Sequence, residues 1–146
     1  MLSDGDQVRN LLGTYCERLD TGDFDGVGAL FADGRLATED GKVLARGADE
    51  VAAFYRAGTL DHDGSPRTKH LVVDTVLLPA GDDRSLTARS SYVVYQAVAG
   101  ILPLQPIITG RYVDTFERAD DGWRWSERRF SVDQIGDLSQ HLARPR

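Results

Sequence analysis

The spacing of apolar residues changes once along this chain, near residue 60, and that change restricts the possible folds most. Before it, apolar residues recur at helical spacing in three segments: 6–19, 24–31 and a stretch after Gly47. After it, β-branched runs separated by turn residues predict four long strands, at 68–78, 85–98, 105–118 and 123–133. Helices followed by strands indicate an α+β fold.

Turn residues predict how these strands pair. Pro-Ala-Gly-Asp-Asp at 79–83 joins the first two long strands, Ala-Asp-Asp-Gly at 119–122 joins the last two, and Asp40-Gly41 closes a short hairpin at 35–45. Because right-handed twist accumulates in long strands, we expect a strongly curved, mostly antiparallel sheet around the three N-terminal helices. No linker or repeat interrupts the 146 residues, so we expect a single domain, 1–146, with a loose tail at 143–146.

Charge and composition exclude several classes of partner. The net charge is −6 and the arginines are spread along the chain, which argues against a nucleic-acid partner. No apolar run has the length of a signal peptide or a membrane span, so we expect no membrane partner and a cytoplasmic location. Cys16 is the single cysteine and cannot form an intrachain disulfide. A small buried hydrophobe is its expected role, and a reactive thiol is the alternative.

The sequence offers no recognisable cofactor or metal motif. The histidines at 62, 70 and 141 lack the spacing of metal ligands, and His62 lies in a segment of turn composition that predicts a surface position. No Gly-x-Gly-x-x-Gly follows a predicted strand, and no Gly-x-Ser-x-Gly nucleophile elbow occurs. We therefore predict no metal and no cofactor.

Four segments, taken in order, resemble the SnoaL-like branch of the nuclear transport factor 2-like (NTF2-like) superfamily. They are Tyr-Cys-Glu-Arg-Leu-Asp-Thr-Gly-Asp-Phe-Asp at 15–25, Thr68-Lys69-His70, Gly-Arg-Tyr through Phe-Glu-Arg at 110–118, and Asp-Gly-Trp-Arg-Trp at 121–125. The resemblance covers nearly the whole chain. It implies an NTF2-like cone, with three helices packed on the curved sheet, and a pocket for a small apolar or cyclic molecule.

The resemblance also implies a pair of catalytic residues. In scytalone dehydratase and hexachlorocyclohexane dehydrochlorinase, relatives in this branch, an aspartate at the end of the first helix pairs with a histidine on the first long strand. Asp20 and His70 match those positions. A neutral imidazole can remove a proton, and a carboxylate behind it fixes the tautomer and stabilises the imidazolium. Two alternatives stay open: a hydrogen bond that only supports the fold, and an aspartate that only supports its own turn.

Strand alternation predicts the lining of the pocket. If His70 faces inward, Val72 shares its face, followed by Asp74 and Val76. On the next strand the alignment of the hairpins places three further residues inward: Ser91, Val93 and Tyr95. Tyr95 stands where scytalone dehydratase has a second histidine, so the dehydration chemistry of that enzyme is not implied.

Further lining residues are predicted from the first helix and the last hairpin. Tyr15 and Tyr112 are expected at the pocket, with plain core as the alternative for Tyr112. Arg128 shares a face with Arg124, Ser126 and Phe130. The resemblance to the dehydrochlorinase places Arg128 in the pocket, where a guanidinium would stabilise an anion or orient a carboxylate. The alternative is an ion pair with an acidic residue at the rim.

Two hypotheses follow for function. The first is a cofactor-independent lyase, isomerase or cyclase in which His70 is the base, Asp20 orients it, and Arg128 and Tyr95 position an apolar or polyketide-like substrate. The second is a non-catalytic ligand-binding or accessory subunit with the same fold. In either case we expect a homodimer, because the outer sheet face, including Trp123 and Trp125, would leave apolar surface exposed.

Overall fold

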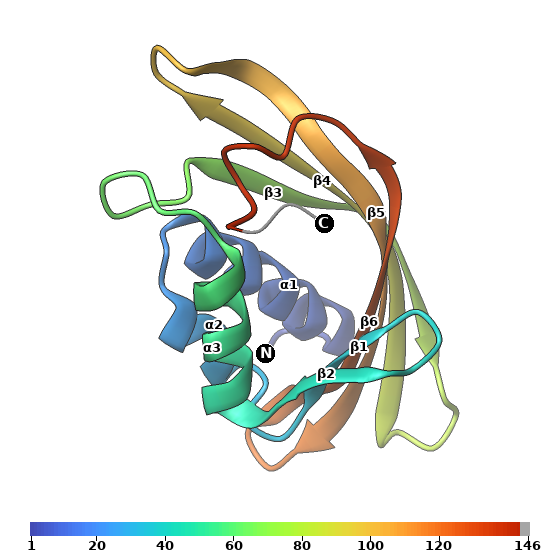
Figure 1. Ribbon diagram of the computed structural model, residues 1–146. Coiled ribbons are helices and arrows are strands. Elements are labelled where there is room, and N and C mark those ends of the chain that lie inside the picture. The colour runs from blue at the N-terminus through green and yellow to red at the C-terminus, as the bar shows by residue number, and fades with distance from the viewer. Residues whose placement is uncertain (144–146) are drawn as a thin grey trace.

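Three helices lie in the hollow of one curved, open sheet in the computed structural model, which describes residues 1–143 (Figure 1). The helices are α1 (Asp4–Asp20), α2 (Phe24–Ala29) and α3 (Gly47–Gly58). The strands are β1 (Arg35–Thr38), β2 (Val43–Arg46), β3 (Thr68–Pro79), β4 (Ser85–Val98), β5 (Leu102–Ala119) and β6 (Gly122–Ile135). These elements confirm the predicted α+β fold and its order of helices and hairpins.

Local chemistry sets both ends of α1. The Ser3 hydroxyl accepts a hydrogen bond from the Asp6 N–H at 3.1 Å, and acidic residues in the first turn favour the positive end of the helix dipole. At the other end Gly22 adopts φ = 77°, and the Asp23 N–H donates to the Arg18 carbonyl at 2.9 Å. This Schellman-type ending stops the helix at Asp20 and so fixes where that carboxylate lies.

The second and third helices pack unusually closely. Asp23 caps α2 through its side chain, which accepts from the Gly26 N–H at 2.9 Å. A Cβ added to Gly28 would lie 2.2 Å from the Ala48 carbonyl oxygen at the start of α3. Only glycine allows this approach, which positions α3 across the hollow of the sheet.

The six strands run in the order β2-β1-β6-β5-β4-β3. β1 pairs parallel with β6, and the other neighbouring strands pair antiparallel. The long hairpins curve around the helices, which lie on one side of the sheet in Figure 1. β3 forms one edge of the sheet and runs beside α1, and this neighbourhood positions the candidate site.

The buried apolar residues form two clusters. The helical core lies between the helices and the sheet, and it includes Val8, Tyr15, Phe31, Phe116 and Trp125. The sheet core lies on β4 and β5 beyond the helices, and it consists of Tyr92, Val94, Val98, Leu102, Ile107 and Tyr112.

The segment 136–143, here called the closing segment, crosses from the end of β6 back to α3 (Figure 1). Leu138 packs on the sheet core, and the Gln96 side-chain amide donates to the Gln140 carbonyl at 2.8 Å. The Leu60 N–H donates to the His141 carbonyl at 2.8 Å, and the Ala143 N–H donates to the Gly58 carbonyl at 3.1 Å. Ala143 is therefore bound rather than loose; the rest of the predicted tail, 144–146, lies outside the described residues.

Both tryptophans of the last hairpin point inward, so the prediction that they lie on the outer sheet face is wrong. Trp123 is 9% exposed and Trp125 is fully buried. The register between β5 and β6 shifts where Thr115 pairs with Glu127 and Phe116 with Trp125, which leaves Ser126 as an extra residue. This bulge changes the alternation, so that Trp125 and Arg128 both face the core, whereas the predicted alternation put Arg124 and Ser126 on the face of Arg128.

Candidate functional site

Asp20 and His70 are hydrogen-bonded to each other. The His70 Nδ1 lies 2.6 Å from the Asp20 Oδ1, and their side chains are 6% and 14% exposed. Two further bonds hold the carboxylate: Oδ2 accepts from the His70 backbone N–H, and Oδ1 accepts from the Thr68 hydroxyl, both at 2.9 Å. With Nδ1–H donating to Asp20, Nε2 carries the free lone pair of a neutral imidazole.

A cavity of about 440 Å³ opens beside His70, between α1 and β3. Leu12, Cys16 and Val72 give it apolar walls, and Arg9 and Asp74, both exposed, lie at its rim. Its volume is within the range of small-molecule sites. Burial raises the pKa of the Cys16 thiol to about 11, so this thiol stays protonated at neutral pH and behaves as an apolar wall residue.

The structure corrects the predicted lining from β4. His70 pairs with Val94 and Val72 with Tyr92, so the inward side chains of β4 are the even-numbered ones, among them Ser90 and Gln96. The predicted inward orientation of three residues is therefore wrong: Ser91, Val93 and Tyr95 lie on the convex face. The run from Ser90 to Tyr95 shows no clear polar alternation, so the sequence did not distinguish its two faces.

A bulge in β3 also overturns part of the predicted lining. The register with β4 shifts between Val73 and Val76, and Asp74 adopts φ = 54°. Val72 stays on the face of His70, but beyond the bulge Thr75 takes the inward position and bonds the Ser90 hydroxyl at 3.0 Å. Asp74 and Val76 are exposed, so they do not continue the face of His70.

Arg128 is completely buried and already paired. Its Nε and Nη2 donate to the two oxygens of Asp114 at 2.7 and 3.1 Å, and both side chains are 0% exposed. Its guanidinium carbon lies 3.6 Å from the ring centre of Tyr112 and 4.3 Å from that of Tyr15. Burial alone would lower the pKa of Arg128, but the Asp114 carboxylate raises it above its usual value. The expected acidic partner exists, in the core rather than at the rim.

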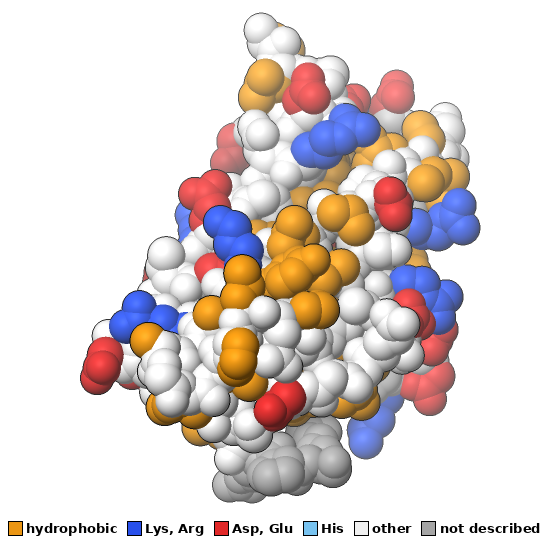
Figure 2. All heavy atoms as spheres, turned by 90° about the horizontal axis from the view of Figure 1, so that it is seen from above, with side chains coloured by type: hydrophobic (Ala, Val, Ile, Leu, Met, Phe, Trp, Pro, Cys, Tyr) orange, Lys and Arg blue, Asp and Glu red, His pale blue; other side chains and the backbone are white. Residues whose placement is uncertain are grey.

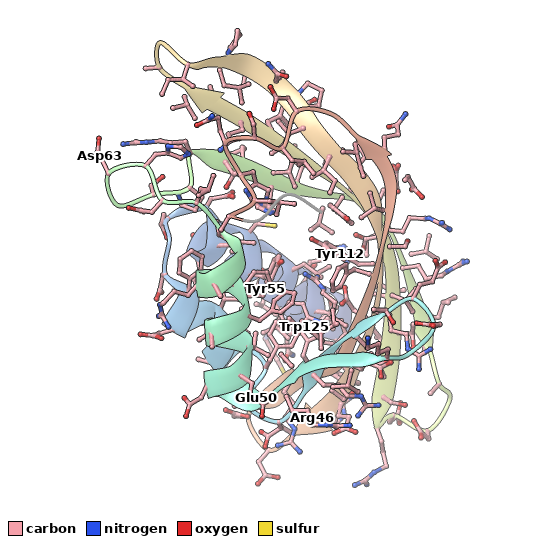
Figure 3. The ribbon with its side chains drawn as sticks, in the orientation of Figure 1. Arg46, Glu50, Tyr55, Asp63, Tyr112 and Trp125 are labelled. Atoms are coloured by element: carbon pink, nitrogen blue, oxygen red, sulfur yellow. The ribbon has the colours of Figure 1, made fainter. Side chains whose placement is uncertain are left out.

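The two tyrosines predicted at the pocket, Tyr15 and Tyr112, lie in the buried core around Arg128 and do not line the cavity beside His70. The Tyr15 and Tyr55 hydroxyls are 2.8 Å apart, and the Tyr15 ring meets His70 edge-on at 6.4 Å. Tyr112 stacks on Tyr92 with ring centres 4.4 Å apart. Figure 3 shows Tyr55, Tyr112 and Trp125 pointing into the space between α3 and the sheet. Burial raises the pKa values of Tyr15 and Tyr55 well above the usual range, so both hydroxyls remain protonated donors.

Two residues of this region were not predicted from the sequence. Asp114 shares the inward alternation of Tyr112 and Phe116, so strand parity could have identified it as a buried acid. His141 belongs to the closing segment, and its ring centre lies 6.3 Å from that of His70. Within residues 1–143 its buried Nδ1 has no hydrogen-bond partner. Burial, then the charge of His70, lowers the pKa of His141 to about 4.

A wider hollow lies at the end of the molecule where the β4–β5 hairpin projects. It measures about 1110 Å³ and is bounded by the loop at 61–67 and the hairpin at 97–104. Figure 2 looks onto this end and shows a group of apolar side chains near the middle of the face, with charged side chains mostly around it. Neither His70 nor Asp20 lines this hollow. His62, predicted at the surface, is half-buried here, and its Nε2 bonds the Gln140 carbonyl at 2.7 Å.

Across residues 1–143 no three acidic, histidine or cysteine side chains are grouped so as to hold a metal ion. Over the same range, no helix has the length and apolar character needed to cross a membrane.

Comparison with known proteins agrees with this geometry. The sequence pattern described as the SnoaL-like domain matches residues 1–129. The chain belongs to the SnoaL-like domain family. This family lies within the NTF2-like proteins and includes polyketide cyclases and dehydratases. No match was found among curated proteins.

Solved structures share the SnoaL-like fold of this chain. ActVI-ORFA from Streptomyces coelicolor is 23% identical, with a TM-score of 0.73, over 89% of this chain and 97% of that one. A protein of unknown function from Mycobacterium tuberculosis is 26% identical, with a TM-score of 0.70, over 88% and 71%. A putative scytalone dehydratase from Novosphingobium aromaticivorans is 18% identical, with a TM-score of 0.69, over 90% and 85%.

Proposed function

We propose that this SnoaL-like chain is a cofactor-independent enzyme of lyase, isomerase or cyclase type, with His70 as the base. The observation that carries the proposal is the hydrogen bond from His70 Nδ1 to Asp20, which leaves Nε2 as the free acceptor of a residue that lines a cavity. A general base needs its orienting group within hydrogen-bond reach, and this pair meets that requirement.

Each residue of the pair has a defined part in this reaction. His70 Nε2 removes a proton from a carbon or hydroxyl of the substrate, and the Asp20 carboxylate stabilises the resulting imidazolium. The proton then returns to a leaving group in an elimination, or to another atom of the substrate in an isomerisation or cyclisation. Apolar walls formed by Leu12, Cys16 and Val72 support a small cyclic or polyketide-like substrate.

Tyr15 is the residue we assign to hold the His70 ring in place, since its ring packs edge-on against the imidazole and its hydroxyl is bonded to that of Tyr55. Arg128 and Tyr112 act one layer further in. Because Arg128 is fully buried and its Nε and Nη2 are bonded to Asp114, its part is to hold the Tyr15 and Tyr112 rings through their faces.

The second candidate function is ligand binding without catalysis. Asp20 accepts three hydrogen bonds from Thr68 and His70, and these tie the end of α1 to the start of β3 whether or not chemistry occurs. A fold-supporting role therefore accounts for the same contacts.

Proton exchange separates the two candidates even while the physiological substrate is unidentified. In D₂O, NMR would follow loss of the α-protons of small cyclic ketones such as 2-tetralone. Replacing His70 by Gln should slow exchange by about 10² to 10⁴-fold, and Asp20→Asn should do the same, since asparagine cannot stabilise an imidazolium. His62→Gln is the matched control. Exchange no faster with the wild type than with His70→Gln across the ketone panel would favour the binding module.

We also propose a homodimer that buries the convex face of the sheet. Leu71, Val73 and Val113 are exposed there, and Leu71 pairs with Val93 on the neighbouring strand. Exposed apolar patches of this kind commonly mark interfaces. Light scattering should return twice the 16.1 kDa chain mass, and Val73→Asp should shift it toward the monomer. A monomer mass for the wild type at micromolar concentration would refute the dimer. The cytoplasmic location stays a prediction from the sequence.

A further inference from the structure

α1 and β3 touch at both ends of their shared length. At one end Asp20 bonds His70, and at the other a Cβ added to Gly5 would lie 3.1 Å from a methyl carbon of Leu77. A helix rises about 1.5 Å and a strand about 3.3 Å per residue. The fifteen steps from Gly5 to Asp20 and the seven from His70 to Leu77 therefore span nearly equal lengths, roughly 23 Å. The two elements run antiparallel and are pinned at both ends.

Between the two contacts, α1 and β3 separate and leave the 440 Å³ cavity. The bulge at Asp74, with φ = 54°, interrupts the regular edge of β3 at this point. On the opposite side Gly13 lines the cavity and is exposed, and an added Cβ there would meet nothing within 4 Å. A missing side chain on the helix and a distorted strand thus face each other across one opening.

The other approach to His70 is covered. The closing segment places His141 6.3 Å from His70. The segment is held by backbone hydrogen bonds to Gly58 and Leu60 and by the Gln96 side chain. Leu138 seals it against the sheet core. Of the two cavities described above, the one between α1 and β3 is the one that His70 lines.

We propose that the substrate reaches His70 through the opening between α1 and β3, and that Gly13 sets the size of molecule that can pass. The proposal rests on the function proposed above, since it takes His70 as the reacting group. It names a class of ligand: a small, flat, largely apolar ring compound, whose polar group lies between Arg9 and Asp74 at the rim while its ring contacts Leu12 and Val72.

Chemical modification of His70 tests the route without any turnover. Diethyl pyrocarbonate acylates accessible unprotonated imidazole nitrogens, and mass spectrometry of peptides reports each of the three histidines separately. In the wild type His70 should react. Gly13→Phe should slow that reaction by at least about tenfold, because a ring at this position covers the opening. Asn10→Phe, exposed on the same helix and outside the cavity, is the matched control and should leave the rate within about twofold.

Two further variants keep the test decisive. Leu138→Ala loosens the closing segment and should leave the His70 rate within about twofold; an increase beyond that would place the route at the closing segment instead. Arg9→Trp narrows the same opening from an exposed position and replaces Gly13→Phe if circular dichroism shows that variant misfolded. An unreactive His70 in the wild type, or equal rates in the blocked and control variants, would overturn the proposal. If the modification rates follow this pattern but the wild type exchanges no ketone protons, the proposed enzyme function is wrong and the proposed access route stands.

Discussion

Two carboxylates in this molecule pair with nitrogen-containing side chains. The two pairs differ in whether a polar atom stays available to a substrate. Asp114 and Arg128 are both 0% exposed, joined by two hydrogen bonds and enclosed by aromatic rings. Asp20 and His70 are slightly exposed, joined by a single side-chain bond, and lie beside a cavity. The first pair has no access to a substrate. The second pair includes His70, which lines a cavity, and on this difference rests the proposal that the first pair serves stability and the second serves chemistry.

The largest expected effect is the loss of one partner from the enclosed pair. Arg128→Met leaves the Asp114 carboxylate buried without a countercharge, and such changes cost about 3 to 5 kcal/mol. Asp114→Leu should be comparably destabilising, because it strands Arg128. The double variant should recover most of the loss, since neither charge is then buried alone. Urea denaturation of the three variants measures this; single variants within about 1 kcal/mol of wild type would contradict the assignment.

A pH-dependent effect of intermediate size is expected at the closing segment. Burial and His70 lower the pKa of His141 from 6.5 to about 4, so the unfolded segment binds more protons between these values. Stability therefore falls as pH drops from about 6.5 to 4, by at most about 3 kcal/mol. The protection factor of the Ala143 amide, whose N–H donates to Gly58, should fall over that range after correction for the intrinsic exchange rate at each pH, and His141→Gln should remove this fall. An unchanged profile in that variant would rule out His141 as the titrating group.

A smaller effect separates the second pair from the first. Asp20→Asn keeps the shape of the side chain but weakens the bonds from Thr68 and His70, and should cost about 1 to 3 kcal/mol. Thr68→Val removes one of these bonds and should cost about 0.5 to 1.5 kcal/mol. Urea unfolding at pH 7 would measure both changes in the free energy of unfolding. A loss from Asp20→Asn as large as that from Arg128→Met would mean that the site pair, too, is chiefly structural.

The positions of the helices and strands could be predicted from the sequence more fully than the faces of the strands. Helical spacing and turn residues located the three helices and the paired strands, because these signals are local. The face of each strand was harder to predict, because one extra residue reverses the alternation. The bulge at Ser126 turned Trp125 inward, and the bulge at Asp74 gave the inward position to Thr75. In β4, the similar residues on both faces led to the assignment of Tyr95 to the wrong side.

The candidate site shows the same limit. Asp20 and His70 were found through a family resemblance, and their contact depends on the Gly22 turn that stops α1 at Asp20. Asp114 could have been predicted from its alternation with Tyr112. His141 could not, because the path of the closing segment depends on Leu138 meeting the sheet core and on backbone bonds to α3. Contacts between distant segments carry no local signal.

The smallest expected effect comes from Gly13, beside the open pair. Gly13→Ala should stabilise the chain by about 0.5 to 1 kcal/mol, because glycine inside a helix is costly and an added Cβ meets nothing within 4 Å. A methyl group is too small to cover the opening, so the His70 modification rate should stay within about twofold of wild type. Gly28→Ala is the contrasting variant: its Cβ would lie 2.2 Å from the Ala48 carbonyl oxygen, so it should destabilise by about 1 to 3 kcal/mol. Thermal unfolding of both variants would decide. A loss of stability in Gly13→Ala would show that the residue is retained for packing, and an unusually stable variant with normal access would show that helix stability and the opening are independent.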